Sequence, residues 1–380
     1  MNSKKRTRND ILKRARRVVV KIGSTVVTSG RSGVNKARIA DISAQLAWLT
    51  EQGVEVIVVT SGAVAAGMSK LGLTEKPKAI ELKQAAASVG QSSLMRVYEK
   101  SLAKHGINVG QMLLTGADLV DRRRFLNARN TLNKLIEYKV IPVINENDTV
   151  SVEELKFSDN DNLAALVANL AGADTLVILS DVDGLYDQDP ANKGAKLISE
   201  VAKITPEVER LAGGSCSVYG TGGMASKLSA AKKAGAGGAA CFIINGRKKG
   251  SINALFEGGD LGTVFFPSGE QLTSKKHWLA FTMRGKGRVV VDDGAAKAIV
   301  AKGKSLLPSG IIAVEGKFSA GDAVEICSED GRAIARGLIH YSHEELDKIK
   351  GKKSSDIEGV LGYKYCDEVI HRDDLVVTGD

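Results

Sequence analysis

The chain has 380 residues, 43% of them hydrophobic, so it is long enough to bury a large core and to form two or three domains. No apolar run approaches the roughly 18 residues of a membrane span and no secretory signal is recognisable, so we expect a cytoplasmic protein without a membrane partner. The four cysteines lie far apart and the five histidines show neither metal-ligand nor triad spacing, which argues against a disulfide framework, a zinc site and hydrolase chemistry.

The net charge of +9 is concentrated at the N-terminus. Residues 1–17 carry eight Lys or Arg against one Asp, whereas residues 285–380 carry 14 basic and 17 acidic side chains. A run of like charges is typical of a solvated, partly disordered segment, so we interpret residues 1–17 as a basic N-terminal extension. Contact of this extension with nucleic acid or another acidic partner is the alternative interpretation.

Short runs of β-branched and other apolar residues predict strands, and helix-length segments lie between them. In chain order, the predicted strands cover residues 18–22, 54–60, 108–114, 140–144, 175–180 and 239–244. The predicted helices cover residues 36–52, 79–105, 122–138, 161–171 and 224–234. Because most of these strands are uniformly apolar, the alternation indicates an α/β domain, a three-layer sandwich with a buried, mainly parallel sheet.

The pattern changes after Phe266. A polar, turn-rich segment is followed by strand-like runs at residues 287–291, 311–314, 323–327 and 333–338, which predict a small β-rich domain. We therefore expect an extension at 1–17, an α/β domain at 18–266, a linker at 267–284, a β-rich domain at 285–368 and a tail at 369–380.

Polar side chains follow several of the predicted strands, at the edge where parallel sheets bind their ligands. Taken singly, Ser61 would serve only a turn, residues 145–148 only an Asx-rich turn, and Ser158 or Asp159 only a helix N-cap. Lys21 is the exception, because a lysine in a strand of Val and Ile is poorly explained as a surface group.

A second cationic element is GTGGMASK at residues 220–227. Glycines let backbone N–H groups approach phosphate oxygens, and Lys227 at the start of the following helix adds a positive charge to the helix dipole. The spacing is not that of a Walker A loop, because Ser226 rather than Gly precedes Lys227. Lys21 and Lys227 together indicate a phosphoryl-transfer site, and a plain flexible loop is the alternative for residues 220–227.

Longer motifs occur in both domains. The α/β domain contains VVVKIGST, VVTSGAVAAG, VGQMLLT, RFLNARNTL, VIPVINENDTV, DNDNLAALVA, DVDGLYDQDP and GTGGMASKLSAA, and the β-rich domain contains SLLPSGI, GKFSAGDAVEI, ARGLIHYS, VLGYKYC and HRDDLVV. The first set resembles the amino acid kinase family, specifically its glutamate-phosphorylating branch. The second set resembles the PUA domain appended to bacterial members of that branch, and the resemblance covers about residues 18–375.

The resemblance implies ATP-dependent transfer of phosphate to the side-chain carboxylate of L-glutamate, the first step of proline biosynthesis, with Mg²⁺ arriving bound to ATP. It also implies feedback inhibition by proline and a homo-oligomer, and it is compatible with hand-off of the product to glutamyl phosphate reductase. Charge in a phosphoryl-transfer transition state spreads over the phosphoryl oxygens, so the site needs cations and N–H donors. Glutamate is already a carboxylate at neutral pH, so no general base is required.

The resemblance also assigns site residues by their position in the motifs. The catalytic set is Lys21, Lys227 and Asp161, with Asp161 holding the two lysines in place. ATP would be bound by Lys21, Ser180, Asp181, Thr221, Gly222, Gly223, Met224, Ala225, Ser226 and Lys227. Glutamate would be bound by Ser61, Asp148 and Asn160, with Ser61 suited to a carboxylate and Asp148 to the ammonium. Ser24 and Thr25 are equivalent candidates for a phosphate contact, and no residue is assigned to a metal.

Two alternatives stay open. Another kinase of this fold would phosphorylate acetylglutamate, carbamate or uridine monophosphate, but Asp148 favours a substrate with a free amine. RNA binding, which PUA domains serve in RNA-modifying enzymes, is disfavoured by the net negative charge of residues 285–380 and by an aromatic content of 4% for the chain.

Overall fold

The computed structural model describes residues 7–28, 33–75, 77, 79–150, 160–212, 223–267 and 286–378. The chain divides into two compact units, Met1–Gln271 and Leu272–Asp380. Most of the expected linker at 267–284 lies outside the described residues. Within the described ranges, no helix has both the length and the apolar character needed to cross a membrane.

The larger unit is built on a sheet of, within the described residues, eight strands in the order β3-β4-β2-β1-β5-β7-β8-β6. All neighbouring strands are parallel except β7 and β8, which confirms the mainly parallel sheet predicted from the sequence. The strands are β1 (Arg17–Ile22), β2 (Glu55–Val59), β3 (Val109–Leu114), β4 (Ile141–Glu146), β5 (Thr175–Ser180), β6 (Glu200–Val201), β7 (Ala240–Asn245) and β8 (Thr263–Phe265).

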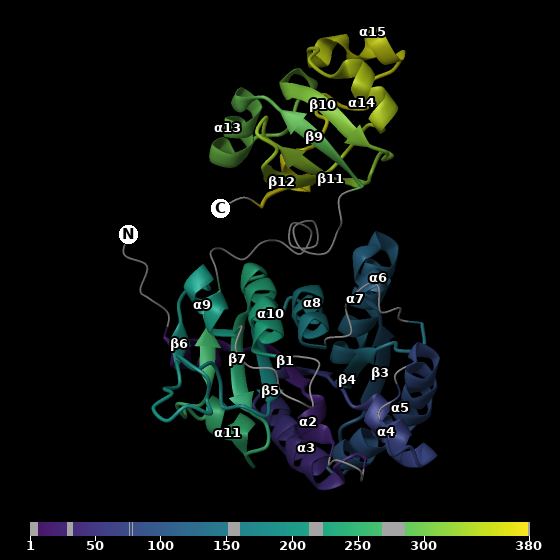
Figure 1. Cartoon of the computed structure of the whole chain (residues 1–380). Coiled ribbons are helices and arrows are strands. Elements are labelled where there is room, and N and C mark those ends of the chain that lie inside the picture. The colour runs from purple at the N-terminus through teal and green to yellow at the C-terminus, as the bar shows by residue number, and fades with distance from the viewer. Residues whose placement is uncertain are drawn as a thin grey trace. The chain divides into compact units, whose positions relative to one another are not determined.

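Helices cover both faces of this sheet and complete a three-layer sandwich, as Figure 1 shows. Helices α3, α5 and α11 lie on one face, and α7, α8 and α10 lie on the other. The helices are α1 (Arg8–Arg14), α2 (Ser24–Val27), α3 (Lys36–Glu51), α4 (Ala63–Leu71), α5 (Ile80–Ala103), α6 (Gly116–Val120), α7 (Arg122–Glu137), α8 (Asn160–Ala171), α9 (Pro206–Leu211), α10 (Met224–Ala236) and α11 (Ser251–Phe256).

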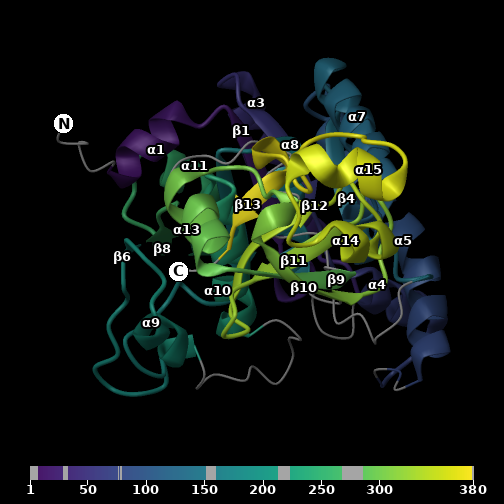
Figure 2. The ribbon, with the colours of Figure 1, turned by 90° about the horizontal axis from the view of Figure 1, so that it is seen from above.

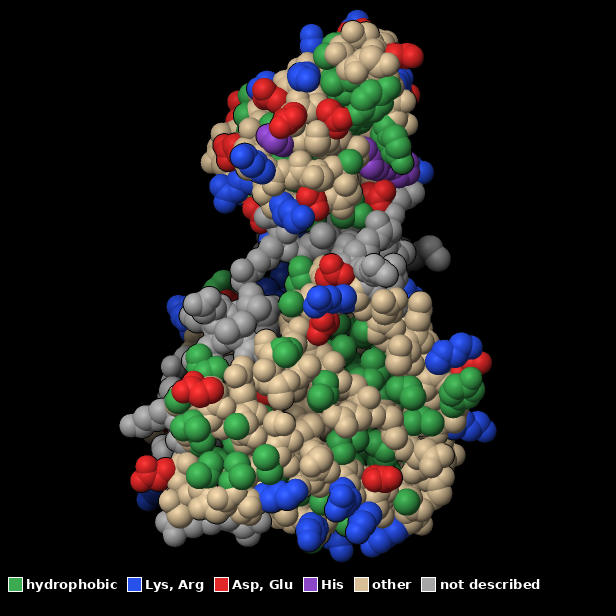
Figure 3. Space-filling model, turned by 90° about the vertical axis from the view of Figure 1, so that its right-hand side faces the viewer, with side chains coloured by type: hydrophobic (Ala, Val, Ile, Leu, Met, Phe, Trp, Pro, Cys, Tyr) green, Lys and Arg blue, Asp and Glu red, His purple; other side chains and the backbone are tan. Residues whose placement is uncertain are grey.

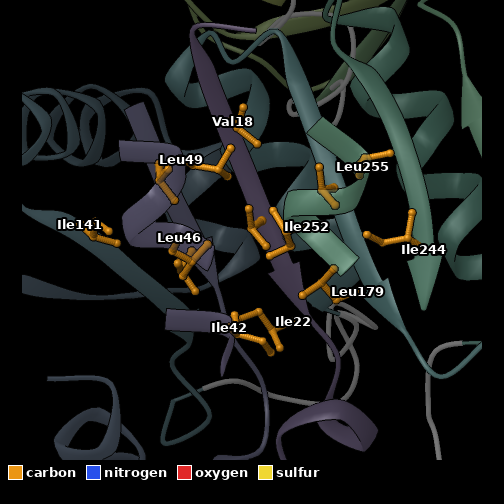
Figure 4. Packing of buried hydrophobic residues seen from close by; sticks show 14 of the residues in the cluster. Val18, Ile22, Ile42, Leu46, Leu49, Ile141, Leu179, Ile244, Ile252 and Leu255 are labelled. Atoms are coloured by element: carbon orange, nitrogen blue, oxygen red, sulfur yellow. The ribbon is translucent and has the colours of Figure 1, made fainter. Parts of the chain in front are cut away.

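The central strand β1 has a different role on each face. Val18 and Ile22 point into the apolar cluster with α3 and α11, where they lie close to residues such as Leu46 and Ile252 (Figure 4). Side chains alternate across a strand, so Lys21 lies on the opposite face, the one covered by α8. The apolar packing of one face therefore fixes the position of a lysine on the other.

Helix α1 corrects one expectation from the sequence. Thr7 and Asp10 form a capping box at its N-terminus, and Leu12 joins the main core at 5% exposure. Arg8 is buried and its Nη1 lies 2.7 Å from Asp260 Oδ1, which places α1 beside α11 (Figure 2). The prediction of a solvated extension is therefore wrong for residues 8–14, while residues 1–6 lie outside the described residues.

Helices α4 and α5 cross with their backbones in direct contact. A Cβ at Gly67 would lie 1.7 Å from the carbonyl oxygen of Ala86, and a Cβ at Gly90 would lie 1.8 Å from that of Ala63. Since real Cβ atoms cannot approach so closely, only glycine fits at either position. The segment after β2 is thereby held against the middle of α5.

The smaller unit contains a sheet in the order β10-β9-β11-β12-β13, in which only the β9–β11 pair is parallel among the described strands. Its strands are β9 (Gly287–Val291), β10 (Ile311–Gly316), β11 (Ala323–Cys327), β12 (Ala333–Leu338) and β13 (Leu375–Val377), and its helices are α13 (Asp293–Lys302), α14 (His343–Ile349) and α15 (Ile357–Leu361). Its own apolar core includes Val289, Ile326 and Tyr341. Strand β13 lies in the segment that we expected to be a tail, and it pairs with β12.

Candidate active site

A buried carboxylate joins the two lysines that the sequence singled out. Lys21 Nζ contacts Asp161 Oδ1, and Lys227 Nζ lies 3.1 Å from Asp161 Oδ2. Lys21 comes from β1, Asp161 from the first turn of α8 and Lys227 from the first turn of α10. Asp161 has no exposed surface and each lysine is 6% exposed.

The charge balance of this cluster suits an anion. Burial by itself raises the pKa of Asp161, but the ammonium groups of Lys21 and Lys227 outweigh it and hold that pKa below its ordinary value. The carboxylate therefore stays ionised and neutralises one of the two positive charges. One positive charge is left over for a ligand that reaches the carboxyl ends of the strands.

The N-terminus of α10 adds backbone donors beside Lys227. Gly223 is the N-cap and offers no side-chain acceptor, so no N-cap side chain occupies the first-turn N–H groups. Ser226 Oγ lies 3.3 Å from Asp161 Oδ2, which places this turn against the buried carboxylate. Met224, Ala225 and Ser226 therefore occupy an anion-binding helix terminus, whereas Thr221 and Gly222 lie outside the described residues.

Ser180 and Asp181 lie at the end of β5. Ser180 is 3% exposed and its hydroxyl donates to Asp181 Oδ1 over 3.3 Å. Two basic residues that the sequence analysis missed also lie here: Arg247 Nη2 is 3.9 Å from Asp181 Oδ2, and Lys248 Nζ is 2.7 Å from Asp183 Oδ1. Both follow β7, so the same search at strand ends that identified Lys21 would have found them.

The expected substrate residues lie at the ends of β2 and β4 and at the start of α8. Asn160 Nδ2 donates to Ser61 Oγ over 2.8 Å and to the Thr60 carbonyl over 3.0 Å. It also lies 3.2 Å from Asn145 Oδ1. Ser61 and Asn160 are therefore directly bonded, and Asn145 belongs to the same network.

Asp148 is a separate acidic group near the end of β4. Burial raises the pKa of its carboxyl to about 6. No ion-pair partner for Asp148 is found in the part of the chain that the structure describes. A partly desolvated carboxylate of this kind is suited to a cationic group of a ligand.

Gln91, in the middle of α5, extends the network and was not anticipated. Asn145 Nδ2 donates to Gln91 Oε1 over 2.8 Å. A glutamine inside a helix carries no strand-end signal, and the packing of α5 on the sheet and on α4 brings it to this site.

The parallel sheet, the lysine pair on Asp161 and the N-terminal turn of α10 fit a phosphotransferase site, and comparison with known proteins agrees. Residues 16–245 match the amino acid kinase family, and residues 287–361 match the PUA domain. The glutamate 5-kinase of Geobacter sulfurreducens is 53% identical, over 97% of this chain and 100% of that protein. The glutamate 5-kinase of Geobacter metallireducens is 56% identical over the same shares. The chain therefore belongs to the amino acid kinase family and, within it, to the glutamate 5-kinases.

Among solved structures, the crystal structure of a UMP kinase from Bacillus anthracis is similar to this chain. It is 17% identical with a TM-score of 0.46, and the match covers 67% of this chain and 97% of that one.

Proposed function

We propose that the protein transfers the γ-phosphoryl group of ATP to the side-chain carboxylate of L-glutamate and so forms L-glutamyl 5-phosphate for proline biosynthesis. The observation that carries this proposal is the pair of lysines on Asp161, with the N-terminal turn of α10 beside them. A carboxylate oxygen of glutamate forms a bond to the γ-phosphorus while the bond from that phosphorus to the β–γ bridging oxygen breaks. ADP leaves, and no proton has to be removed from the nucleophile.

The two lysines have different roles in this proposal. Lys21, which ends the central strand, contacts the transferred phosphoryl group. Lys227 and the first-turn N–H groups of α10 bind the nucleotide phosphates. Asp161 holds both ammonium groups at the same carboxylate, so they are in position before ATP arrives. Ser180 and Asp181 flank the nucleotide.

Glutamate binds at the ends of β2 and β4. Ser61 serves a carboxylate, and Asp148 and Asn160 serve the ammonium group. The raised pKa of Asp148, about 6, supports this role because an ammonium ion supplies the counter-charge that the partly buried carboxylate lacks in the described residues.

Among the residues that the structure describes, no cluster of three or more His, Cys, Asp or Glu side chains could hold Mg²⁺. Both oxygens of Asp161 are engaged by lysines, and Asp183 is paired with Lys248. Mg²⁺ binds oxygen ligands and usually keeps several of its waters. We therefore propose that the ion arrives bound to the triphosphate and keeps its water ligands.

Three further properties stay predictions: inhibition by proline, a homo-oligomer and hand-off to glutamyl phosphate reductase. Figure 3 shows hydrophobic side chains scattered over one face of the larger unit. On α4, the turn after it and α5, Leu71, Leu73 and Leu82 are exposed by 49%, 42% and 55%. A homo-oligomer would bury these side chains if its subunits meet at this surface.

The test is ATP turnover with hydroxylamine trapping of the acyl phosphate, with L-glutamate, N-acetyl-L-glutamate, L-aspartate and uridine monophosphate compared under the same conditions. We expect hydroxamate with glutamate and at most traces with the others. Turnover with another acceptor only would leave the phosphate site standing and refute the roles of Ser61, Asp148 and Asn160. If none supports turnover, the kinase proposal fails and RNA binding by the smaller unit is tested by gel shift at low salt.

A further inference from the structure

The side-chain amides of Asn160, Asn145 and Gln91 form a hydrogen-bonded chain near Ser61. The orientation of the Asn160 amide is fixed by the backbone. The carbonyl oxygen of Thr60 can only accept a hydrogen bond, so the Asn160 atom 3.0 Å from it has to be the amide nitrogen. That nitrogen also faces Asn145, which must therefore present its oxygen to Asn160, at 3.2 Å. The orientation of both amides thus follows from a single backbone carbonyl.

The same rule fixes Gln91. With its oxygen toward Asn160, Asn145 has its amide nitrogen left to donate, and Gln91 accepts from it through Oε1 over 2.8 Å. Gln91 cannot flip without opposing two N–H₂ groups. The Gln91 Nε2 group, with both of its hydrogens, is therefore the part of this amide that does not bond to Asn145.

Both ends of this chain are buried and unsatisfied. Gln91 Nε2 and Asn160 Oδ1 have no hydrogen-bond partner among the residues that the structure describes. The first can only donate and the second can only accept. Leaving such groups unpaired away from water is costly, which makes them candidates for ligand contacts.

The fold also places Gln91 beside the expected substrate residues. Its neighbour Gly90 packs against the backbone of Ala63, two residues after Ser61, at the crossing of α4 and α5. An amino acid substrate offers the matching pair of groups, because its α-ammonium donates and its α-carboxylate accepts. In the proposed reaction the side-chain carboxylate of glutamate faces the transferred phosphoryl group, so the α-carboxylate is the group left for Gln91.

We propose that Gln91 is a further substrate-binding residue, whose amide N–H₂ donates to the α-carboxylate of the amino acid while Asn160 Oδ1 accepts from its ammonium. This inference rests on the proposed function. The deciding variant is Gln91→Glu, which keeps the oxygen that accepts from Asn145 and replaces only the donor by a second oxygen. Gln91→Met removes both groups, and Gln52→Glu, at the exposed end of α3, makes the same chemical change away from the site.

The measurement is steady-state kinetics for glutamate and for ATP, with thermal unfolding of the same samples. For Gln91→Glu we expect the KM for glutamate to rise roughly 10- to 100-fold, since a hydrogen bond to a charged group is lost and a like charge is added. The KM for ATP should stay that of the unsubstituted protein, while the Tm falls because the substitution places a carboxylate in a buried position. Gln91→Met should raise the KM for glutamate and also lower the Tm, because Asn145 loses its acceptor. Gln52→Glu should change neither.

Two results would overturn the inference. One is a KM for glutamate in Gln91→Glu within twofold of the original value. The other is an equal rise in the KM for both substrates, because Gln91 would then only support the amide chain. Failure of the proposed function is a different result, since the unsubstituted protein itself would form no glutamyl hydroxamate.

Discussion

Lys21 and Lys227 contact opposite oxygens of the Asp161 carboxylate. Lys21 lies on the central strand β1 and Lys227 lies on α10, far from it in the sequence. A carboxylate with both oxygens engaged is unsuited to bind a metal or to accept a proton. Its role is to hold two positive charges at a fixed separation. The two lysines are therefore positioned without help from the nucleotide.

Replacing Lys227 with Ala should lower kcat by roughly two to four orders of magnitude, the scale for removing a preorganised charge from a transition state. The measurement is hydroxamate formation at saturating ATP and glutamate. Lys232→Ala is the matched control, because Lys232 lies on the same helix, is exposed and pairs only at the surface with Glu209. Unchanged turnover in the Lys227 variant would remove this residue from the mechanism.

Asp148 should make glutamate use depend on pH. The carboxyl titrates at about 6 in the free protein, and only its ionised form binds an ammonium group. We expect kcat/KM for glutamate to fall about tenfold per pH unit below that value, since kcat/KM reports groups of the free enzyme. Asp148→Asn should give a lower, flat profile, and a retained inflection in that variant would assign the titration to another group.

The same carboxyl should also affect stability. Its pKa rises from 3.8 to about 6 on folding, so the folded state binds more protons between these values. Stability is therefore lost as pH rises through this window, and the loss persists above it. In urea unfolding at pH 7.5, Asp148→Asn should be more stable than the unsubstituted protein by about 1–3 kcal/mol, and the difference should vanish below about pH 4.

Proline should inhibit in competition with glutamate. It keeps the α-carboxylate and the cationic nitrogen that Ser61 and Asp148 would bind, but it lacks the carboxylate that reacts. Initial rates at several proline concentrations should therefore return to the uninhibited value as glutamate is raised. Inhibition that saturating glutamate does not relieve would require a separate proline site.

Leu12→Ala tests the role of α1. Leu12 is 5% exposed within the main core, so its truncation should cost about 2–4 kcal/mol of unfolding free energy. Leu211→Ala is the control, because Leu211 is 38% exposed on α9. Equal urea midpoints for the two variants would show that α1 does not contribute to the core.

The sequence predicts the parallel sheet well because its strands are buried on both faces and their apolar runs are unmistakable, as at Thr175–Ser180. It predicts Lys21 for the same reason, since a charge inside such a run is conspicuous. It does not predict α1, because a short basic helix is distinguished from a solvated segment only by Leu12 and by an ion pair with Asp260, far away in the chain.

Among the residues proposed to bind glutamate, some were likewise predicted from the sequence and one was not. Ser61 and Asn160 follow from motifs, and their hydrogen bond joins the end of β2 to the start of α8. Gln91 does not, because its place depends on how closely two helices approach, and that distance is set by residues without side chains. A pattern of polar residues along one element cannot report a contact that a different element creates.

The contact of Gly67 and Gly90 with the opposite helix has a consequence for selectivity. With no side chain between α4 and α5, neither helix can move closer to the other, and the hydrogen bond from Asn160 restrains Ser61. We therefore expect the separation between Ser61 and Gln91 to change little when glutamate binds. On that expectation a longer amino acid is used poorly as a substrate.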